Sequence, residues 1–556
     1  MTDEVYSRFA LEQIPRLLGS MDRNPMSPTY GCMHRDYWLY KTSDFPDAVR
    51  QFGVHALALA WAHPFSGNPY QRQPKVLEWI RAALAFWTSI QHRDGSFDEF
   101  YPYERGWVGP SAFTTYASAA SLALVGDELP ADDVEAIRTA VDRAAVFIAT
   151  GDREEDHLAN HHAMACLAVD TAAELLDDDR LRHRVHDLWR GFLTYHTDEG
   201  WSREYDGIDP GYLSATVSFL GKIWDRTRDE EILRVLRESV EISSYFVYPN
   251  GAYAGSMGSR NTLHFYPHGY EILAAEMPAA AAVADRMRLA LSSGNLVPPS
   301  IMSDRYAGYR VPEFLLAALA HQGRAPSDTT LPCEGPDFSR QFPEARIWVE
   351  KKGDRYRLAN LAKGGVYKEF AGKHLAESDG GIVGVLEGGR IVTSQWIADD
   401  HDCRQGPDWW EVSGQMCEVT LAKRFTPVTH ILFRLVLIGI GWSPRASHAL
   451  KGWIRRRLIL KQRQVPVRFR RSFRRRDGVC RLSTELEIRG PVRFARLMLG
   501  DEFFVRYVPQ SMFFQRQELE TSGEMIEADE IAAVNASGRL VRTRSWRTDG
   551  QETARA

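Results

Sequence analysis

Cysteine is scarce in this chain of 556 residues, and its six cysteines lie far apart, with no CxxC pair. They are Cys32, Cys166, Cys333, Cys403, Cys417 and Cys480. This spacing offers neither a zinc-binding nor a disulfide framework and is typical of reduced thiols in a cytoplasmic protein. The N-terminal stretch MTDEVYSRFALEQIPRLLGS also lacks the apolar core of a secretory signal. We therefore expect a cytoplasmic protein without a metal site.

Acidic residues are absent between Val419 and Arg476, a stretch that contains 16 lysines and arginines. The whole chain has 68 basic and 73 acidic side chains, so 52 basic and 73 acidic residues lie outside this stretch, a net charge of about −21 there. The sequence thus describes a mildly acidic protein with one concentrated basic segment. No nucleic-acid-reading motif accompanies this segment, so nucleic acid is not an expected partner.

Long uninterrupted apolar runs are absent from residues 54–341, where apolar residues instead recur at helical spacing. The pattern predicts helices over 76–91, 133–149 and 230–246, among others, separated by short links rich in Gly, Asp and Pro. No run in this region reaches the length of a membrane-spanning helix. Residues 1–53 are interpreted as a lead-in segment.

The links between the predicted helices resemble one another. Gly95, Gly200 and Gly251 each follow an acid or amide and precede aromatic and polar residues, at spacings of 105 and 51 residues. A period of about 52 residues accommodates a helical hairpin with its two loops. We therefore predict an incomplete (α/α) toroid of helical hairpins whose polar loops gather at one mouth. An irregular helical bundle is the alternative.

The pattern changes after about Pro343, where short segments rich in β-branched and aromatic residues are broken by glycine turns. Residues 342–556 are therefore predicted to form an antiparallel β-sandwich, and the whole chain is α and then β. A basic amphipathic insertion is predicted within it, over 427–476.

Three loops of the helical region concentrate residues that could carry chemistry. The first begins a predicted helix and holds His157, Asn160 and His161. The second, WSREYDGIDPGY, holds Glu204, Tyr205 and Tyr212, and the third holds Arg260, His264 and His268. A polar helix start explains the first set equally well, and a metal site lacks a third ligand or an HExxH motif. A loop arginine could clamp a carboxylate or only tie down its loop.

The chain resembles the heparinase II/III-like (α/α)-toroid polysaccharide lyases in three features. It has an Asn-His pair at a helix start, a Tyr 52 residues later, and a helical repeat domain before a β domain. The resemblance covers nearly the whole chain and implies catalytic roles for Asn160, His161 and Tyr212, with Arg260 as a further candidate. Members of the family carry a His-rich motif early in the β domain, where this chain offers only His374. The implied substrate-binding residues are His157, Glu204, Tyr205, His264, His268 and His374.

Such lyases cleave uronate polymers by removing the C5 proton and expelling the oxygen at C4, without a cofactor. The C5 proton is weakly acidic while the neighbouring carboxylate is charged, so the site must neutralise that carboxylate. Asn160, His161 and Arg260 suit this task, and Tyr212 could act as base, acid or both. A tyrosine with an ordinary pKa near 10 would need nearby positive charge to ionise, and we expect His161 or Arg260 to supply it.

Other functions remain open at this point. A C5-epimerase would abstract the same proton, and a glycoside hydrolase could use a pair drawn from Asp98, Glu99, Glu204 and Asp209. The third alternative is a non-catalytic polysaccharide-binding protein of exopolysaccharide assembly. The segment 427–476 could bind anionic lipid at the inner membrane face, hold acidic polysaccharide, or form a solvated surface.

Overall fold

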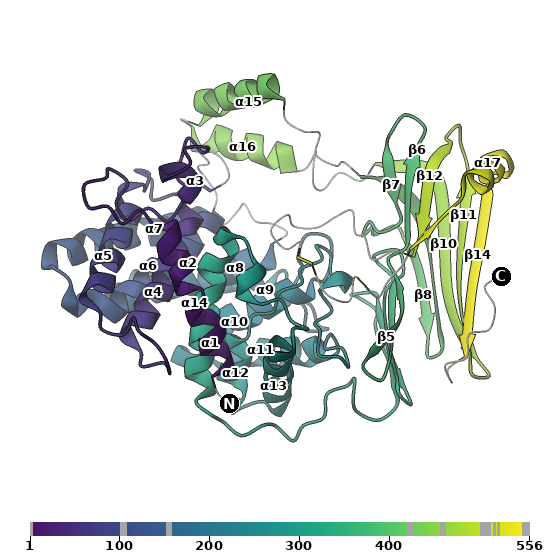
Figure 1. The fold of residues 1–556 in the computed structure, drawn as a ribbon, viewed down its shortest axis with the longest axis horizontal. Helices are drawn as coiled ribbons and strands as arrows, with labels where there is room; N and C mark the ends of the chain where they lie inside the picture. The colour runs from purple at the N-terminus through teal and green to yellow at the C-terminus, as the bar shows by residue number, and fades with distance from the viewer. Residues whose placement is uncertain are drawn as a thin grey trace.

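The computed structural model describes residues 4–99, 108–151, 158–419, 426–441, 443–455, 463–500, 513–514, 519 and 523–547. Helices fill the chain as far as His321, and two antiparallel sheets follow from Phe338 onward (Figure 1). The predicted order of an α domain and then a β domain is confirmed.

Six helices form the inner ring of the α domain. They are α4 (Gly53–Ala62), α6 (Val108–Val125), α8 (Ala159–Leu176), α10 (Pro210–Thr227), α12 (His268–Leu273) and α14 (Asp304–His321). Each contacts the next in chain order, and α14 returns to contact α4. The outer layer consists of α5 (Pro74–Ser89), α7 (Ala131–Gly151), α9 (Asp179–Leu193), α11 (Glu230–Ser244), α13 (Pro278–Ser293) and α1 (Val5–Leu11). The predicted toroid of hairpins is confirmed, and its inner ring is closed rather than incomplete.

The N-terminal residues belong to this toroid, although the sequence suggested only a lead-in segment. Helix α1 packs against α14 and α13, and the Tyr6 hydroxyl donates to Glu271 Oε1 of α12 at 3.1 Å. Shorter elements complete the domain: α2 (Ile14–Ser20), α3 (Arg35–Trp38), η1 (Ala48–Phe52), η2 (Gly126–Glu128), η3 (Gly255–Met257) and η4 (Pro299–Ile301). Local patterning does not indicate this packing, because the main helical partners of α1 are α14 and α13, at the other end of the domain.

One glycine turn recurs in the loops that the sequence repeat identified. Gly95, Gly200 and Gly251 have φ of +91°, +88° and +87°. Each glycine N–H donates to the carbonyl three residues earlier, that of His92, Thr197 or Tyr248. A Cβ on Gly200 would overlap the carbonyl oxygen of Glu238 in the next outer helix, and a Cβ on Gly95 would overlap that of Arg143. Close packing and positive φ therefore both require glycine here.

The β domain is a sandwich of two antiparallel sheets, as predicted. The five-stranded sheet contains β1 (Phe338–Phe342), β2 (Ile347–Lys352), β3 (Arg355–Asn360), β4 (Val366–Ala371) and β5 (His374–Asp379) in sequential order. The nine-stranded sheet has the order β13-β12-β6-β7-β9-β10-β11-β14, with β8 paired to β9. Its strands are β6 (Ile382–Leu386), β7 (Ile391–Thr393), β8 (Asp402–Gly406), β9 (Trp409–Glu418), β10 (Gln464–Arg476), β11 (Val479–Ile488), β12 (Phe494–Leu499), β13 (Glu524–Met525) and β14 (Arg539–Arg547). Helix α17 (Ala528–Ser537) packs on β12.

The five-stranded sheet lies between the toroid and the nine-stranded sheet (Figure 1), so its central strands β2, β3 and β4 are largely buried on both faces. Along β2, Ile347 and Val349 join the core of the toroid, whereas Trp348 joins the core of the sandwich. The Tyr356 hydroxyl on β3 donates to the Tyr245 carbonyl at 2.5 Å. Alternation along each strand thus supplies apolar contacts to two layers, and the β domain is packed directly on the toroid.

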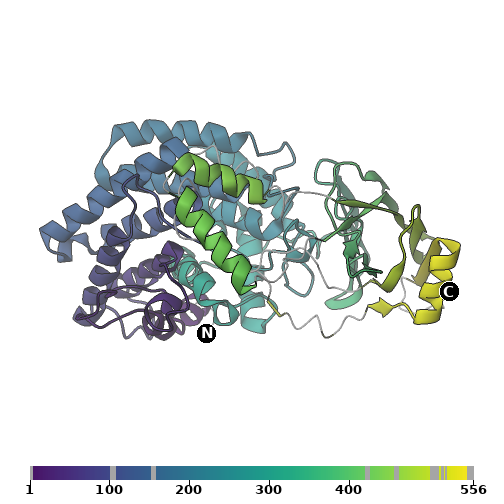
Figure 2. The same cartoon turned by 90° about the horizontal axis from the view of Figure 1, so that it is seen from above.

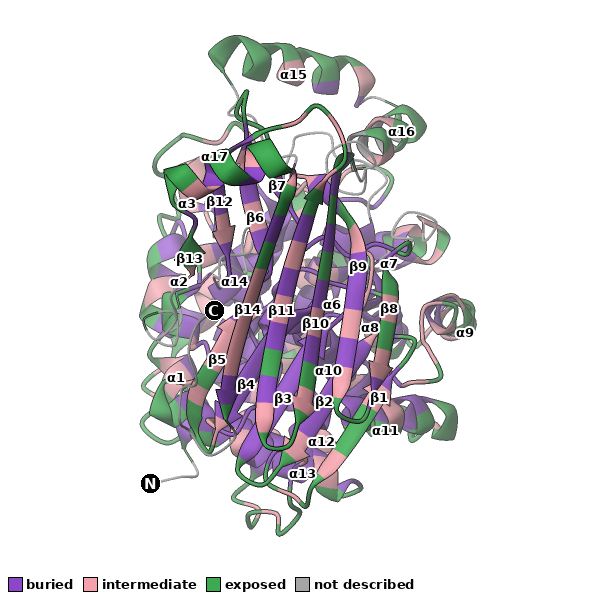
Figure 3. Cartoon of the chain, turned by 90° about the vertical axis from the view of Figure 1, so that its right-hand side faces the viewer, coloured by how far each residue is buried: buried purple, intermediate pink, exposed green. Residues whose placement is uncertain are grey.

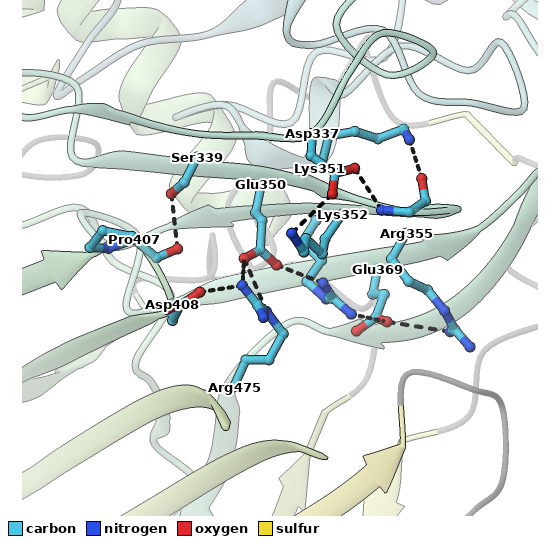
Figure 4. Close-up of polar contacts among 12 residues, drawn as sticks. Asp337, Ser339, Glu350, Lys351, Lys352, Arg355, Glu369, Pro407, Asp408 and Arg475 are labelled. Atoms are coloured by element: carbon cyan, nitrogen blue, oxygen red, sulfur yellow. Dashed lines mark hydrogen bonds and ion pairs between the residues drawn. The ribbon is translucent and has the colours of Figure 1, made fainter. Parts of the chain in front are cut away.

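Charged side chains are buried inside the sandwich (Figure 4). Arg357 donates to Glu350 at 2.6 Å and to Glu369 at 2.9 Å, and Arg475 donates to Glu350 at 2.7 Å. Arg475 belongs to the acid-free basic stretch, so part of that stretch is a strand of the sandwich. The predicted insertion over 427–476 is corrected accordingly: two helices, α15 (Pro427–Ile440) and α16 (Pro444–Arg455), precede β10.

Alternating buried and exposed residues mark β10 as a strand with one solvent-facing side (Figure 3). Arg468 and Arg470 are exposed, whereas Val467 and Phe469 are buried. Within the described ranges, no helix combines the length and the apolar composition that crossing a membrane requires.

Candidate active site

The candidate site lies at the mouth where α8 and α10 begin. The loop between α9 and α10 runs beside the start of α8, where the Ala159 N–H donates to the Arg203 carbonyl at 3.2 Å. The Asn160 backbone N–H donates to Glu204 Oε2 at 3.1 Å. Glu204 thus occupies the position of an acceptor for the free N–H groups at a helix N-terminus.

Asn160 and Glu204 form a buried pair. The Asn160 carboxamide donates to Glu204 Oε1 at 2.6 Å. Burial raises the pKa of Glu204 to about 8. The hydrogen bonds from Asn160 and the nearby His161 lower this pKa but do not offset the effect of burial. His161 itself is half-buried and meets Phe113 of α6 edge to face at 5.6 Å between ring centroids.

A second buried carboxyl group, that of Asp209, joins the second and third loops. It caps α10 by accepting from the Tyr212 N–H at 3.1 Å, and it also accepts from the Arg260 N–H at 2.9 Å. Burial raises the pKa of Asp209, while these hydrogen bonds lower it. One carboxyl group therefore fixes the backbones that carry Tyr212 and Arg260.

Tyr212 is half-buried at the first turn of α10. Burial raises its pKa well above the ordinary value, and nearby Tyr306, Tyr205, Glu204 and Asp209 raise it further. We had expected positive charge to favour the ionised phenol, and the structure contradicts this because phenols and carboxyl groups dominate the surroundings. Tyr212 therefore keeps its proton at neutral pH.

Arg260 lies against Tyr205, with its guanidinium carbon 4.3 Å from the centre of the ring. Tyr205 adopts a left-handed backbone conformation, with φ of 58°, and is half-buried. Arg260 is itself buried. A cation–π contact thus places the guanidinium next to a ring that also influences Tyr212.

Comparisons with known proteins give a family-model match and similar solved structures. Residues 70–266 match the family model described as the ulvan lyase N-terminal domain, a range that includes Asn160, His161, Tyr212 and Arg260. A Paenibacillus xanthan lyase superposes with a TM-score of 0.52 at 11% identity, covering 89% of this chain and 46% of that one. The chondroitin AC lyase of Streptomyces coelicolor A3, solved in complex with chondroitin sulphate, superposes with a TM-score of 0.53 at 12% identity. This match covers 99% of the present chain and 78% of the chondroitin lyase chain.

The chain has the fold of the (α/α)-toroid polysaccharide lyases. The resemblance drawn from the sequence is thereby confirmed. The chain spans 46% of the length of the xanthan lyase chain. No curated protein sequence matches it significantly.

The β domain of this lyase fold supports the third loop of the site. Lys363 is buried and donates to the carbonyls of Ser256 at 2.8 Å and Gly258 at 2.7 Å, and it also contacts Asn261 Oδ1. Asn360 Nδ2 donates to the Met257 carbonyl at 2.6 Å. The sequence analysis missed both residues, although a lysine and an asparagine in the largely apolar run ANLAKGG were a usable signal.

The structure brings together six of the predicted site residues: Asn160, His161, Glu204, Tyr205, Tyr212 and Arg260. His264 is wholly buried, packs edge to face with Tyr212 at 6.3 Å, and has its pKa lowered by burial and by Arg310. It can influence a substrate only through its neighbours.

His268 and His374 lie apart from this group. His268 begins α12 beside the middle of α10, and burial, Lys222 and His55 lower its pKa. It therefore faces the interior of the toroid. His374 is exposed at the start of β5, and His157 lies outside the described residues.

Helix α14 contributes residues that the sequence analysis did not identify. Tyr306 packs against Tyr309 with ring centroids 4.8 Å apart and raises the pKa of Tyr212, so phenols of α14 border the site. Arg310 lies over the Tyr266 ring, 3.7 Å from its centre. Tyr306, Tyr309 and Arg310 are spaced as neighbours on one helix face, a pattern that was visible in DRYAGYR.

The carboxyl groups considered for a glycoside hydrolase are already engaged. Glu99 pairs with Arg305, and Asp98 lies 3.1 Å from His92 Nε2. Glu204 and Asp209 accept the backbone and side-chain hydrogen bonds described above. Across the described part of the chain, no cluster of three or more metal-ligating side chains occurs.

A pocket of about 270 Å³ lies between the second loop and the β domain. Asp206 and Gly207 line it on the toroid side, directly after Tyr205, and Arg346 and Asp399 line it on the other side. The two domains thus enclose a hollow next to the site.

Proposed function

We propose that this protein is a polysaccharide lyase that cleaves an acidic, uronate-containing polysaccharide by β-elimination. The observation that carries the proposal is the convergence of Asn160, His161, Tyr212 and Arg260 at one mouth of the toroid. The ulvan lyase N-terminal domain match supports it, since the match spans all four residues. The fold neighbours support it as well, since their titles describe lyases of xanthan and chondroitin.

The substrate carboxylate must be neutralised before the C5 proton becomes acidic enough to transfer. Arg260 carries a permanent positive charge and lies against Tyr205 at the mouth. The N-terminus of α8 adds partial positive charge beside Asn160 and His161. These groups would stabilise the charge that develops on the carboxylate as C5 loses its proton.

The two proton transfers are then assigned to different residues. Tyr212 keeps its proton at neutral pH, which suits a group that donates a proton to the departing O4. His161, which the sequence analysis assigned to carboxylate neutralisation, is proposed instead to accept the C5 proton through its imidazole. The C5–H electron pair forms the C4–C5 double bond, the C4–O4 bond breaks, and O4 takes the Tyr212 proton. The atoms balance without a cofactor or a redox partner.

The test is a screen of uronate polymers that follows the near-ultraviolet absorbance of unsaturated chain ends. We expect Tyr212→Phe and His161→Ala to lose at least about a hundredfold in rate, the usual contribution of an acid–base group. Tyr245→Phe is the matched control, because Tyr245 is also half-buried but lies at the end of α11, against Phe338 and Phe342 of the β domain.

The outcomes separate the alternatives. Full turnover by Tyr212→Phe and His161→Ala would overturn the assignment. New reducing ends without absorbance would indicate hydrolysis, and C5 proton exchange without cleavage would indicate an epimerase. Binding without any reaction, in a folded wild-type protein, would favour a non-catalytic polysaccharide-binding role.

A further inference from the structure

Helix α15 exposes an apolar surface that has no counterpart elsewhere in the described part of the chain. Six aliphatic side chains on it are between 42% and 66% exposed. They are Val428, Ile431, Leu432, Leu435, Val436 and Ile438. Single exposed aliphatic residues are ordinary on protein surfaces, but a contiguous group of this kind marks a binding surface.

The orientation of α15 is fixed by its opposite side. Arg434 forms an ion pair with Asp44 at 2.9 Å and lies over the Phe45 ring at 5.5 Å, and Leu437 is buried. Thr426 and Thr429 form a capping box that begins the helix. The only charged residue of the helix thus points toward the toroid, and the apolar side is left outward.

The helical pair lies on the outside of the toroid. It leaves the sandwich between β9 and β10 and lies over the toroid near α3 (Figures 1 and 2). Figure 3 shows α15 as an almost continuously exposed helix at one end of the molecule. A flat surface could therefore approach it without meeting the sandwich.

The second helix adds positive charge and an aromatic residue. Arg445 and Trp453 of α16 are exposed, Trp453 by 51%. The sequence from 426 to 463 holds eight lysines and arginines and no acid, within a chain that is otherwise acidic. An apolar helix, a tryptophan and flanking cations are the features of a segment that lies in a membrane interface.

We propose that α15 and α16 dock this protein on an anionic lipid bilayer, with the apolar side of α15 in the interface. At 14 residues, α15 is about 21 Å long, whereas a bilayer core is about 30 Å thick. The helix therefore lies in the surface rather than crossing it. Charge complementarity favours anionic lipid over a second copy of this acidic chain, whose basic segments would repel each other.

The experiment is flotation of the full chain with vesicles of phosphatidylcholine containing 30% phosphatidylglycerol or none. We expect wild type to float with the anionic vesicles. Leu435→Asp should lower the partition coefficient at least tenfold. Leu289→Asp is the matched control and should float as wild type does, because Leu289 is 52% exposed on α13. Arg445→Glu should weaken binding to the anionic vesicles alone.

Three results would overturn the proposal. The first is that wild type does not float with the vesicles, and the second is that Leu435→Asp floats as well as wild type. The third is that light scattering finds wild type as a dimer without lipid and Leu435→Asp as a monomer. The last would assign the surface to a second copy of the chain. Circular dichroism of each variant checks folding, and the result does not depend on the proposed lyase activity.

Discussion

Replacing Glu204 by glutamine should change how the stability of the protein depends on pH. The Glu204 carboxyl group is buried and its pKa is raised from 4.5 to about 8. Below pH 4.5 the group is protonated in both folded and unfolded chains, and its contribution to stability is complete. Between pH 4.5 and 8 only the unfolded chain ionises, so stability falls as the pH rises.

The size of the effect follows from the shift. One pKa unit corresponds to about 1.4 kcal/mol, so a shift of this size corresponds to at most about 5 kcal/mol of unfolding free energy. Glutamine does not titrate. The difference in unfolding free energy between wild type and Glu204→Gln should therefore change steadily from pH 4.5 to 8 and then level off.

Urea unfolding followed by circular dichroism, at pH values from 4.5 to 9, measures this difference. Other titrating groups are common to both proteins and cancel in the comparison. Glu387→Gln, at an exposed pair with Arg493, should run parallel to wild type at all pH values. If Glu204→Gln also runs parallel to wild type, Glu204 ionises normally and the buried pair with Asn160 is wrongly described.

Two further predictions concern the scaffold. Gly200→Ala should lower the unfolding free energy by about 3 kcal/mol, because it combines a positive φ with a Cβ that overlaps the next helix. Gly67→Ala, at φ +68° in open space, should lower it by about 1 kcal/mol. Equal unfolding free energies of the two variants would contradict this. Glu369→Gln should lower the unfolding free energy by about 3 kcal/mol, because it removes the charge of one of the two buried carboxylates that pair with Arg357, whereas the exposed Glu487→Gln should leave the unfolding free energy nearly unchanged. Urea unfolding measures both pairs, and a small effect of Glu369→Gln would show that Glu350 alone is a sufficient charged partner for Arg357.

Periodicity predicted the helices well because their apolar residues face a core. The predicted helix over 76–91 corresponds to Pro74–Ser89, and that over 133–149 to Ala131–Gly151. The repeat length also predicted that Asn160 and Tyr212 lie on adjacent hairpins. One period corresponds to one hairpin, so these two residues fall at the starts of adjacent inner helices. The role of α1 was missed because its partners are α13 and α14, at the far end of the domain.

The site was predicted only in part because its contacts join distant residues. The pair between Asn160 and Glu204 spans 44 residues, and Tyr306 lies on a helix that no motif connects with Tyr212. The raised pKa of Tyr212 could not be predicted either, since it depends on which neighbours surround the phenol. In β10, the alternation of Val467 and Phe469 with arginines was present in the sequence, but the density of charge obscured it.

The α domain is closed as a ring, yet its functional mouth depends on the β domain. Lys363 holds the carbonyls of Ser256 and Gly258, and that loop continues to Arg260, whose N–H is fixed by Asp209. The five-stranded sheet shares the core of the toroid on one side. Removing the β domain would expose this apolar face and free the loop that carries the guanidinium. The proposed active mouth is therefore a product of both domains, and a toroid without its sandwich would lack the geometry that the proposed elimination needs.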